Sequence, residues 1–143
     1  MYQNDIENFS NFGAKFQENL AKLIFIDRAF ADQIGEVLDY SYFDVSYLQS
    51  FVEMLYDYKE NYKVHPSLNT MASVLLSEQN KHDEVVFKQM KDFMVRTHAN
   101  QDTEGADFIK DASLDFCRKQ KLKAAIIKSV DLLRSSSFDE IAD

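Results

Sequence analysis

The scarcity of residues that break a helix is the feature that most constrains the fold of this chain. Its 143 residues include only three glycines and one proline. Since glycine and proline are the strongest local signals for turns, few turns are forced and long helices are permitted. Apolar residues recur at steps of three and four along most of the chain, and strand-like alternation is never sustained. The sequence therefore predicts an all-α fold.

The apolar periodicity predicts a compact head of about five helices. Asp27 and Ser67 each precede an apolar helical pattern, so each is expected to act as an N-cap. Pro66 ends the preceding helix, because the residue before a proline avoids helical angles. The aromatic segment "DYSYFD" breaks the helical period and is expected to place its rings in the core. The expected helices cover approximately residues 16–26, 28–38, 45–62, 67–76 and 84–94.

Three segments are expected along the single domain. Residues 1–12 show no clean period, and residues 1–15 are predicted to form a loose or partly ordered N-terminal arm. Residues 16–98 form the helical head, and the polar stretch "THANQDTEG" separates it from residues 106–143. This last segment is predicted to be an incomplete helical hairpin. Its first arm, from about Ala106 to Leu133, carries an apolar face made of Phe108, Ala112, Phe116, Leu122, Ile126, Val130 and Leu133.

The last ten residues, "RSSSFDEIAD", have the form of a helix start. Ser137 and Glu140 have the spacing of a capping box, in which each side chain satisfies a free backbone N–H group of the other residue. Phe138 and Ile141 would begin an apolar face of this second arm. The sequence therefore predicts that the second arm of the hairpin starts at Ser137 and is truncated, with the intact protein continuing beyond Asp143.

Charge is unevenly distributed along the chain. The net charge is −8, but residues 116–134 hold six basic residues and one acidic residue, a local charge of +5 against −13 elsewhere. An acidic body repels phosphate backbones, which argues against tight DNA binding by the whole chain. The basic stretch is interpreted mainly as a solvated helix face or a complement to the acidic remainder. A weak contact with nucleic acid or a partner is the alternative, with Arg118, Lys119, Lys121 and Lys123 as its candidates.

Residues that could carry catalysis, a cofactor or a metal are not recognised in the sequence. The three glycines stand apart, so no P-loop can form. His65, His82 and His98 lack the spacing of paired metal ligands, and no Glu-x-x-His unit of a di-iron site occurs. The sequence therefore predicts no catalytic, cofactor-binding or metal-binding residue, and no enzyme activity for this segment.

Two further groups of side chains have a structural and a functional interpretation. Glu53, Asp57 and Glu60 share a helix face at a spacing that could hold a metal, but a solvated face is the favoured interpretation. Cys117 lies beside basic residues, which would lower its pKa if it were exposed; a half-buried structural cysteine is favoured.

This single cysteine cannot form an internal disulfide, and the longest apolar run is too short to cross a bilayer. A cytoplasmic protein is therefore expected.

The stretch Phe16–Leu76 resembles the N-terminal domain of DnaB-type replicative DNA helicases, particularly those of T4-like phages. The segments that carry the resemblance are "LAKLIFID", "DYSYFD" and "HPSLNTMASVLL", which match an opening helix, an aromatic connection and a proline-serine helix start. The tail "ADFIKDASLDFCRKQKLKAAIIKSVDLLRSSSFDEIAD" resembles the helical hairpin of that family. One departure is the segment Ala21–Leu23, where cellular members usually carry a glycine.

The resemblance implies a non-catalytic N-terminal domain of a hexameric helicase. In that family the N-terminal domains form a collar, pair through their hairpins as a trimer of dimers, and dock primase. The apolar face named above would then serve self-association, and a helicase loader is a further expected partner. Single-stranded DNA would be met only indirectly. The resemblance also implies a downstream motor that uses ATP and magnesium, and, for a phage protein, the cytoplasm of a bacterial host.

Two other classes of protein remain as alternatives. One is a free-standing acidic helical phage protein that inhibits or binds a partner by imitating the charge of DNA. Such a protein would array its carboxylates along one face, whereas here acidic and apolar residues interleave on most helices. The other is a helical enzyme whose site is not recognisable from sequence.

Overall fold

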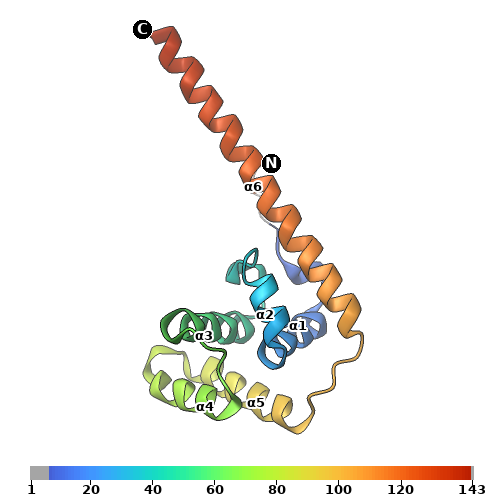
Figure 1. Ribbon diagram of the computed structural model, residues 1–143. Coiled ribbons are helices and arrows are strands. Elements are labelled where there is room, and N and C mark those ends of the chain that lie inside the picture. Colours follow the sequence, from blue (N-terminus) through green and yellow to red (C-terminus); the bar gives the residue numbers. More distant parts are fainter. Residues whose placement is uncertain (1–6, 143) are drawn as a thin grey trace.

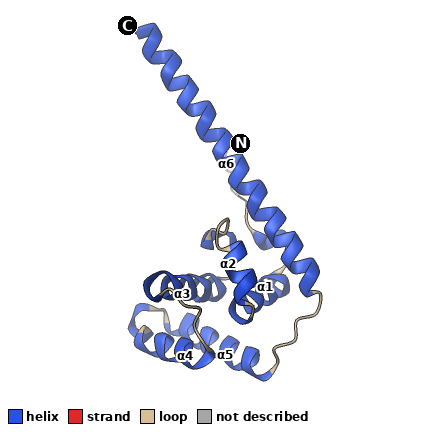
Figure 2. Ribbon diagram, in the orientation of Figure 1, coloured by secondary structure: helices blue, strands red, loops and turns tan. Residues whose placement is uncertain are grey.

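The computed structural model describes the backbone of residues 7–142 and the side chains of residues 7–136. Within this part of the chain every regular element is helical and no strand occurs (Figure 2). The predicted all-α fold is confirmed. Five helices and three short 3-10 turns build a head, and a sixth helix projects from it (Figure 1). The elements are η2 (Phe9–Phe12), α1 (Ala14–Ile26), α2 (Arg28–Ile34), η3 (Tyr40–Tyr42), α3 (Ser46–Tyr62), α4 (Leu68–Ser77), η4 (Gln79–Lys81), α5 (Glu84–Ala99) and α6 (Ala106–Ala142).

Both predicted N-caps are confirmed. The Asp27 carboxylate accepts a hydrogen bond from the Phe30 N–H at 3.1 Å, at the start of α2. The Ser67 hydroxyl accepts one from the Thr70 N–H at 3.2 Å, at the start of α4. Each bond satisfies an N–H group that the first turn of a helix leaves without an intrahelical partner. These local bonds explain why the starts of α2 and α4 could be predicted.

The core of the head forms where α1 and α3 cross and where α3 packs on α5. Leu20 of α1 and Leu55 of α3 are fully buried, and the rings of Phe51 and Phe93 meet edge to face at 4.9 Å. The aromatic connection also contributes, because Tyr42 and Phe43 are buried as predicted. A core of interlocking rings fixes the angle between helices, since aromatic pairs favour edge-to-face and offset contacts.

The first described residues are ordered and do not form a loose arm. They form the 3-10 turn η2, and Phe9 is completely buried. Its ring lies 5.3 Å from Phe43 and 4.9 Å from Phe116, measured between centroids. A single anchoring ring leaves no periodic pattern, so its burial could not be predicted from the sequence. Residues 1–6 of the predicted arm lie outside the described residues.

The last helix, α6, extends well beyond the head. Its 37 residues begin beside α1 and α2, and its C-terminal half projects away from every other element (Figure 1). The predicted start of a second arm at Ser137 is wrong, because the backbone stays helical through Ala142. Without glycine or proline between Leu133 and Ser137, a helix already under way has no reason to stop there. The side chains of Ser137 and Glu140 lie outside the described residues.

The helices of the described residues do not have membrane-spanning character. Among the described residues, none combines the length and the apolar composition that a bilayer crossing requires.

Candidate functional site

The projecting helix α6 carries two apolar stripes on roughly opposite sides. One stripe, which we call the inner stripe, faces the head and contains Ile109, Ser113 and Cys117, all buried. At about 100° per residue, Leu122, Ile126 and Leu133 lie on roughly the opposite side of the same helix. We call the exposed side chains of this second line the outer stripe, formed by Leu122, Ile126, Val130 and Leu133.

The residues of the predicted self-association face have different surroundings: some pack on the head, and others belong to the outer stripe. Ala112 and Phe116 are partly buried against the head's own core, and the Phe116 ring meets Tyr42 edge to face at 5.4 Å. These two residues are therefore used within the chain rather than left for a partner. Phe108 is exposed at the root of the helix, although its ring touches Phe16 at a centroid distance of 6.3 Å.

The four residues of the outer stripe have no partner among the described residues. Leu122 is 62% exposed, Ile126 54% and Leu133 68%, and Val130 is less exposed than these three. Large apolar side chains scattered singly on a surface are ordinary, but a continuous line of them marks a site of interaction. The structure therefore leaves this part of the predicted face available, along the half of α6 that projects from the head (Figure 1).

Sequence reasoning missed the residues that hold α6 on the head. Ile109 and Leu114 are buried. Ser113, a small residue of α6, is also buried where the helix meets the head, and its hydroxyl donates to the Lys110 carbonyl at 3.1 Å. The apolar periodicity of this helix was ambiguous in the sequence, because Phe108 and Ile109 are adjacent and each begins an apolar pattern. Phe108 is exposed, as a self-association face requires, whereas Ile109 is buried against the head.

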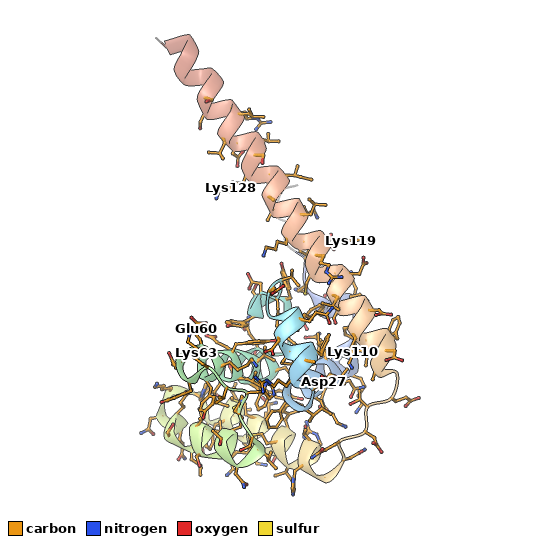
Figure 3. The ribbon with its side chains drawn as sticks, in the orientation of Figure 1. Asp27, Glu60, Lys63, Lys110, Lys119 and Lys128 are labelled. Carbon is orange, nitrogen blue, oxygen red and sulfur yellow. The ribbon has the colours of Figure 1, made fainter. Side chains whose placement is uncertain are left out.

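Ionic contacts fix the direction in which α6 leaves the head. The Lys110 ammonium lies 2.7 Å from the Asp27 carboxylate and over the ring of Phe30, joining α6 to the start of α2 (Figure 3). This hydrogen bond from Lys110, together with the backbone N–H of Phe30, holds the pKa of Asp27 below its usual value. On α1, the buried Lys22 donates to the carbonyl of Asp102 in the loop before α6.

The basic cluster makes contacts within its own chain. The Lys121 ammonium donates to the Glu36 carbonyl at 3.0 Å, and Lys123 lies 3.4 Å from the Glu7 carboxylate. Lys119 lies 3.0 Å from Asp115 on the exposed surface of α6, and Arg118 is also exposed. These contacts support the interpretation that the cluster complements acidic and polar groups of the head.

A hollow of about 660 Å³ lies where α6 leaves the head, between the helix and η3. Tyr42 lies on its head side, and Ala124 and Ile127 on its α6 side. Charged residues, among them Lys128 and Asp131, continue the lining along α6. The α6 side of this hollow therefore combines apolar and polar residues, whereas the outer stripe is apolar.

The residues with reactive side chains are placed in structural roles. Cys117 is fully buried, and burial raises the pKa of its thiol to about 12, so the structural interpretation of this residue is supported. His65 lies between the Phe25 carbonyl, 2.6 Å from its Nε2, and the Lys59 ammonium, 3.1 Å from its Nδ1. The acidic side chains of Glu53, Asp57 and Glu60 lie on the exposed face of α3. In the described part of the chain, no three His, Cys, Asp or Glu side chains gather as metal ligands would.

Comparisons with protein-family models, with curated proteins and with solved structures found no match to this chain. The resemblance to helicase N-terminal domains therefore stays a prediction from the sequence. The geometry of the outer stripe is the observation on which a function can be argued.

Proposed function

We propose that this chain is an assembly domain whose α6 pairs with α6 of a second copy through the outer stripe. The observation that supports the proposal is the uninterrupted line of exposed apolar side chains on a helix that extends beyond its own head. Two such helices can bury their stripes against each other, as pairs of amphipathic helices do in coiled coils. The head holds each helix root in place, so the stripe is presented to the partner without rearrangement.

The expected affinity is modest. Complete burial of a Leu, Ile or Val side chain contributes about 1.5–3 kcal/mol, and these side chains are already partly shielded by their own helix. Association costs at least about 4 kcal/mol in lost translational and rotational freedom. The short stripe should therefore give a reversible dimer, which a ring of further subunits or a tethered second domain would strengthen.

In its finer form the proposal follows the resemblance to DnaB-type helicases. The chain would be the collar domain of a hexameric replicative helicase, non-catalytic itself, with primase as a partner and the ATPase motor encoded downstream. A helical head followed by a long projecting helix fits that assignment. It accounts for a stripe that no described residue covers.

Sedimentation equilibrium tests the pairing directly. In chains that also carry Phe138→Asp, which leaves the outer stripe intact, the parent should shift from monomer to dimer with rising concentration, and Ile126→Asp should abolish the shift by placing a charge in the middle of the stripe. Ala125→Asp is the matched control, because it adds the same charge at an exposed neighbouring position on a different side of α6. A chain that stays monomeric at every concentration, or an equal effect of both variants, would contradict the proposal.

Sequencing the gene beyond codon 143 tests the helicase assignment separately. The assignment expects a P-loop of the form G-x-x-x-x-G-K-S/T within the length of one or two domains, roughly 100–300 codons. A downstream region without this motif would contradict the helicase assignment and leave the pairing proposal intact.

A further inference from the structure

A second apolar surface lies on the head, at the end opposite to the projecting half of α6. It is a groove of about 400 Å³ between α4 and α5, within the size range of ligand pockets in proteins. Leu76 and Val95 stand on its rim and are 61% and 67% exposed. The residues that line the groove are Leu68, Asn69, Ala72, Leu75, Leu76, Lys91, Met94, Val95 and His98.

The charge of the groove indicates the chemistry of a segment that could bind in it. Among the described residues that line it, Lys91 and His98 are the ionisable ones, and none is a carboxylate. A groove of this kind suits an amphipathic helix that presents apolar residues at a spacing of three or four and carries acidic neighbours.

The end of α6 has this chemistry. In the segment "SFDEIAD", Phe138 and Ile141 are three residues apart, and the acidic residues are Asp139, Glu140 and Asp143. The backbone is helical through Ala142, so residues at this spacing share one face of the helix. The preceding part of the projecting helix is basic, with four basic residues and one acidic residue in 120–136, and would be repelled by Lys91.

The end of α6 cannot reach the groove of its own head. A straight helix of 37 residues is about 55 Å long. Figure 1 shows the C-terminal end of α6 on the far side of the molecule from α4 and α5. Any contact between the two must therefore join different copies of the chain.

We propose that the C-terminal segment of the chain, residues 137–143, docks in the α4–α5 groove of a second copy. Phe138 and Ile141 fill the groove between Leu76 and Val95, and the acidic residues of the segment lie near Lys91. This contact is head to tail, and a heterologous contact of this kind generates a closed ring or an open chain. It uses none of the outer-stripe residues, so it stands or falls independently of the α6–α6 pairing.

Mixing two complementary full-length variants tests this contact. One carries Val95→Asp, which blocks the groove, and the other carries Phe138→Asp, which blocks the helix end; both also carry Ile126→Asp to prevent stripe pairing. Each variant alone should sediment as a monomer, whereas an equimolar mixture should form 1:1 dimers. An Ile126→Asp chain without either block should form larger oligomers as its concentration rises. A monomeric mixture, or a Phe138→Asp chain that associates as strongly as its parent, would overturn the proposal.

Control variants separate the groove from the rest of α5. Val85→Asp changes an equally exposed valine of α5 outside the groove and should leave association unchanged. Lys91→Glu should weaken association about fivefold, the effect of one exposed ion pair worth about 1 kcal/mol. Combining it with Asp139→Lys in the partner should restore the affinity. Equal losses with Val85→Asp and Val95→Asp, or no recovery on charge exchange, would also overturn the proposal. Circular dichroism establishes that each variant is folded.

Discussion

The two halves of α6 form one continuous helix, yet they differ in what surrounds them. Around Ile109, Ser113 and Cys117 the helix is covered by the head, whereas around Leu122 and Ile126 no described residue covers it. Both halves show apolar residues at helical spacing, so their sequence patterns look alike. The difference shows that periodicity identifies an apolar side of a helix but does not identify the partner that covers it.

Hydrogen exchange should show the largest difference between these halves. In a chain kept monomeric by Ile126→Asp and Phe138→Asp, amides of residues 109–117 should exchange only on global unfolding, and amides of residues 122–136 by local fraying. If global stability is at least about 5 kcal/mol, protection should differ by a factor of roughly 1,000 or more. Equal protection along α6, measured residue by residue by NMR, would contradict the contrast between the two halves.

Removing one ring from the head should have the next largest effect. Phe9→Ala empties a site that is fully enclosed by Phe43, Phe116 and their neighbours. A loss of about 3–5 kcal/mol in the free energy of unfolding is expected from denaturant titration. Phe12→Ala is the control, because Phe12 is exposed in the same 3-10 turn, and it should cost clearly less. Similar losses for the two variants would mean that Phe9 is not an anchor of α6.

A polar change at the inner stripe should have an intermediate effect. Cys117→Ser buries a hydroxyl where the thiol is fully enclosed, and should lower the free energy of unfolding by about 1–3 kcal/mol. A control makes the opposite substitution in the projecting half of α6. Ser129 is exposed there, so Ser129→Cys should change the free energy of unfolding little. Its new thiol should react rapidly with iodoacetamide at pH 8, whereas Cys117 should react only on unfolding because its pKa is raised and it is buried. Fast alkylation of Cys117 in the folded chain would contradict this.

The head should also lose stability in mild acid, while the projecting half of α6 should not contribute to this loss. Burial lowers the pKa of His65, and the Lys59 ammonium at its Nδ1 adds to this effect, although the Phe25 carbonyl and the Asp32 carboxylate favour the charged form. The unfolded chain therefore binds a proton at His65 more readily than the folded chain does. Stability is complete above about pH 6.5 and falls as the pH drops through the lowered pKa of the folded state.

Thermal denaturation between pH 7.5 and 5 measures this effect. His65→Gln can still donate to the Phe25 carbonyl and accept from Lys59 but does not titrate, so its melting temperature should vary less across this range. The carboxylates of Glu18, Asp27 and Asp32, whose pKa values are lowered in the folded chain, lose stability only at more acidic pH. An unchanged pH profile in the variant would rule out His65 as the titrating group.

The smallest effect on folding is expected in the outer stripe. Leu122→Ala removes a side chain that is mostly exposed, so the free energy of unfolding of the monomer should change by less than about 0.5 kcal/mol. The same variant should weaken dimerisation measurably, because this side chain becomes buried only in the proposed pair. A large loss of monomer stability would mean that the stripe is covered within the chain.

Much of the head could be predicted from residues close together in the sequence. Asp27 and Ser67 were identifiable as caps because the bond that each makes reaches only three residues along the chain. The Phe9 anchor could not be predicted, because its contacts reach Phe43 and Phe116, far away in the sequence. The first arm of the predicted hairpin was ended too early, at about Leu133, and a second helix start was placed at Ser137, because a capping-box pattern marks a helix start only where the preceding backbone is extended.

The sequence by itself determined that this chain is helical and where most of its helices begin. It also determined that the last helix carries more apolar residues than one buried face uses. These properties depend on backbone hydrogen bonds and side-chain spacings within about one turn. Only the tertiary structure decided which stripe of α6 packs on the head and which faces outward. That choice depends on how well Ile109, Ser113 and Cys117 fit against the surface presented by α1 and α2, and such a fit exists only once the head has folded.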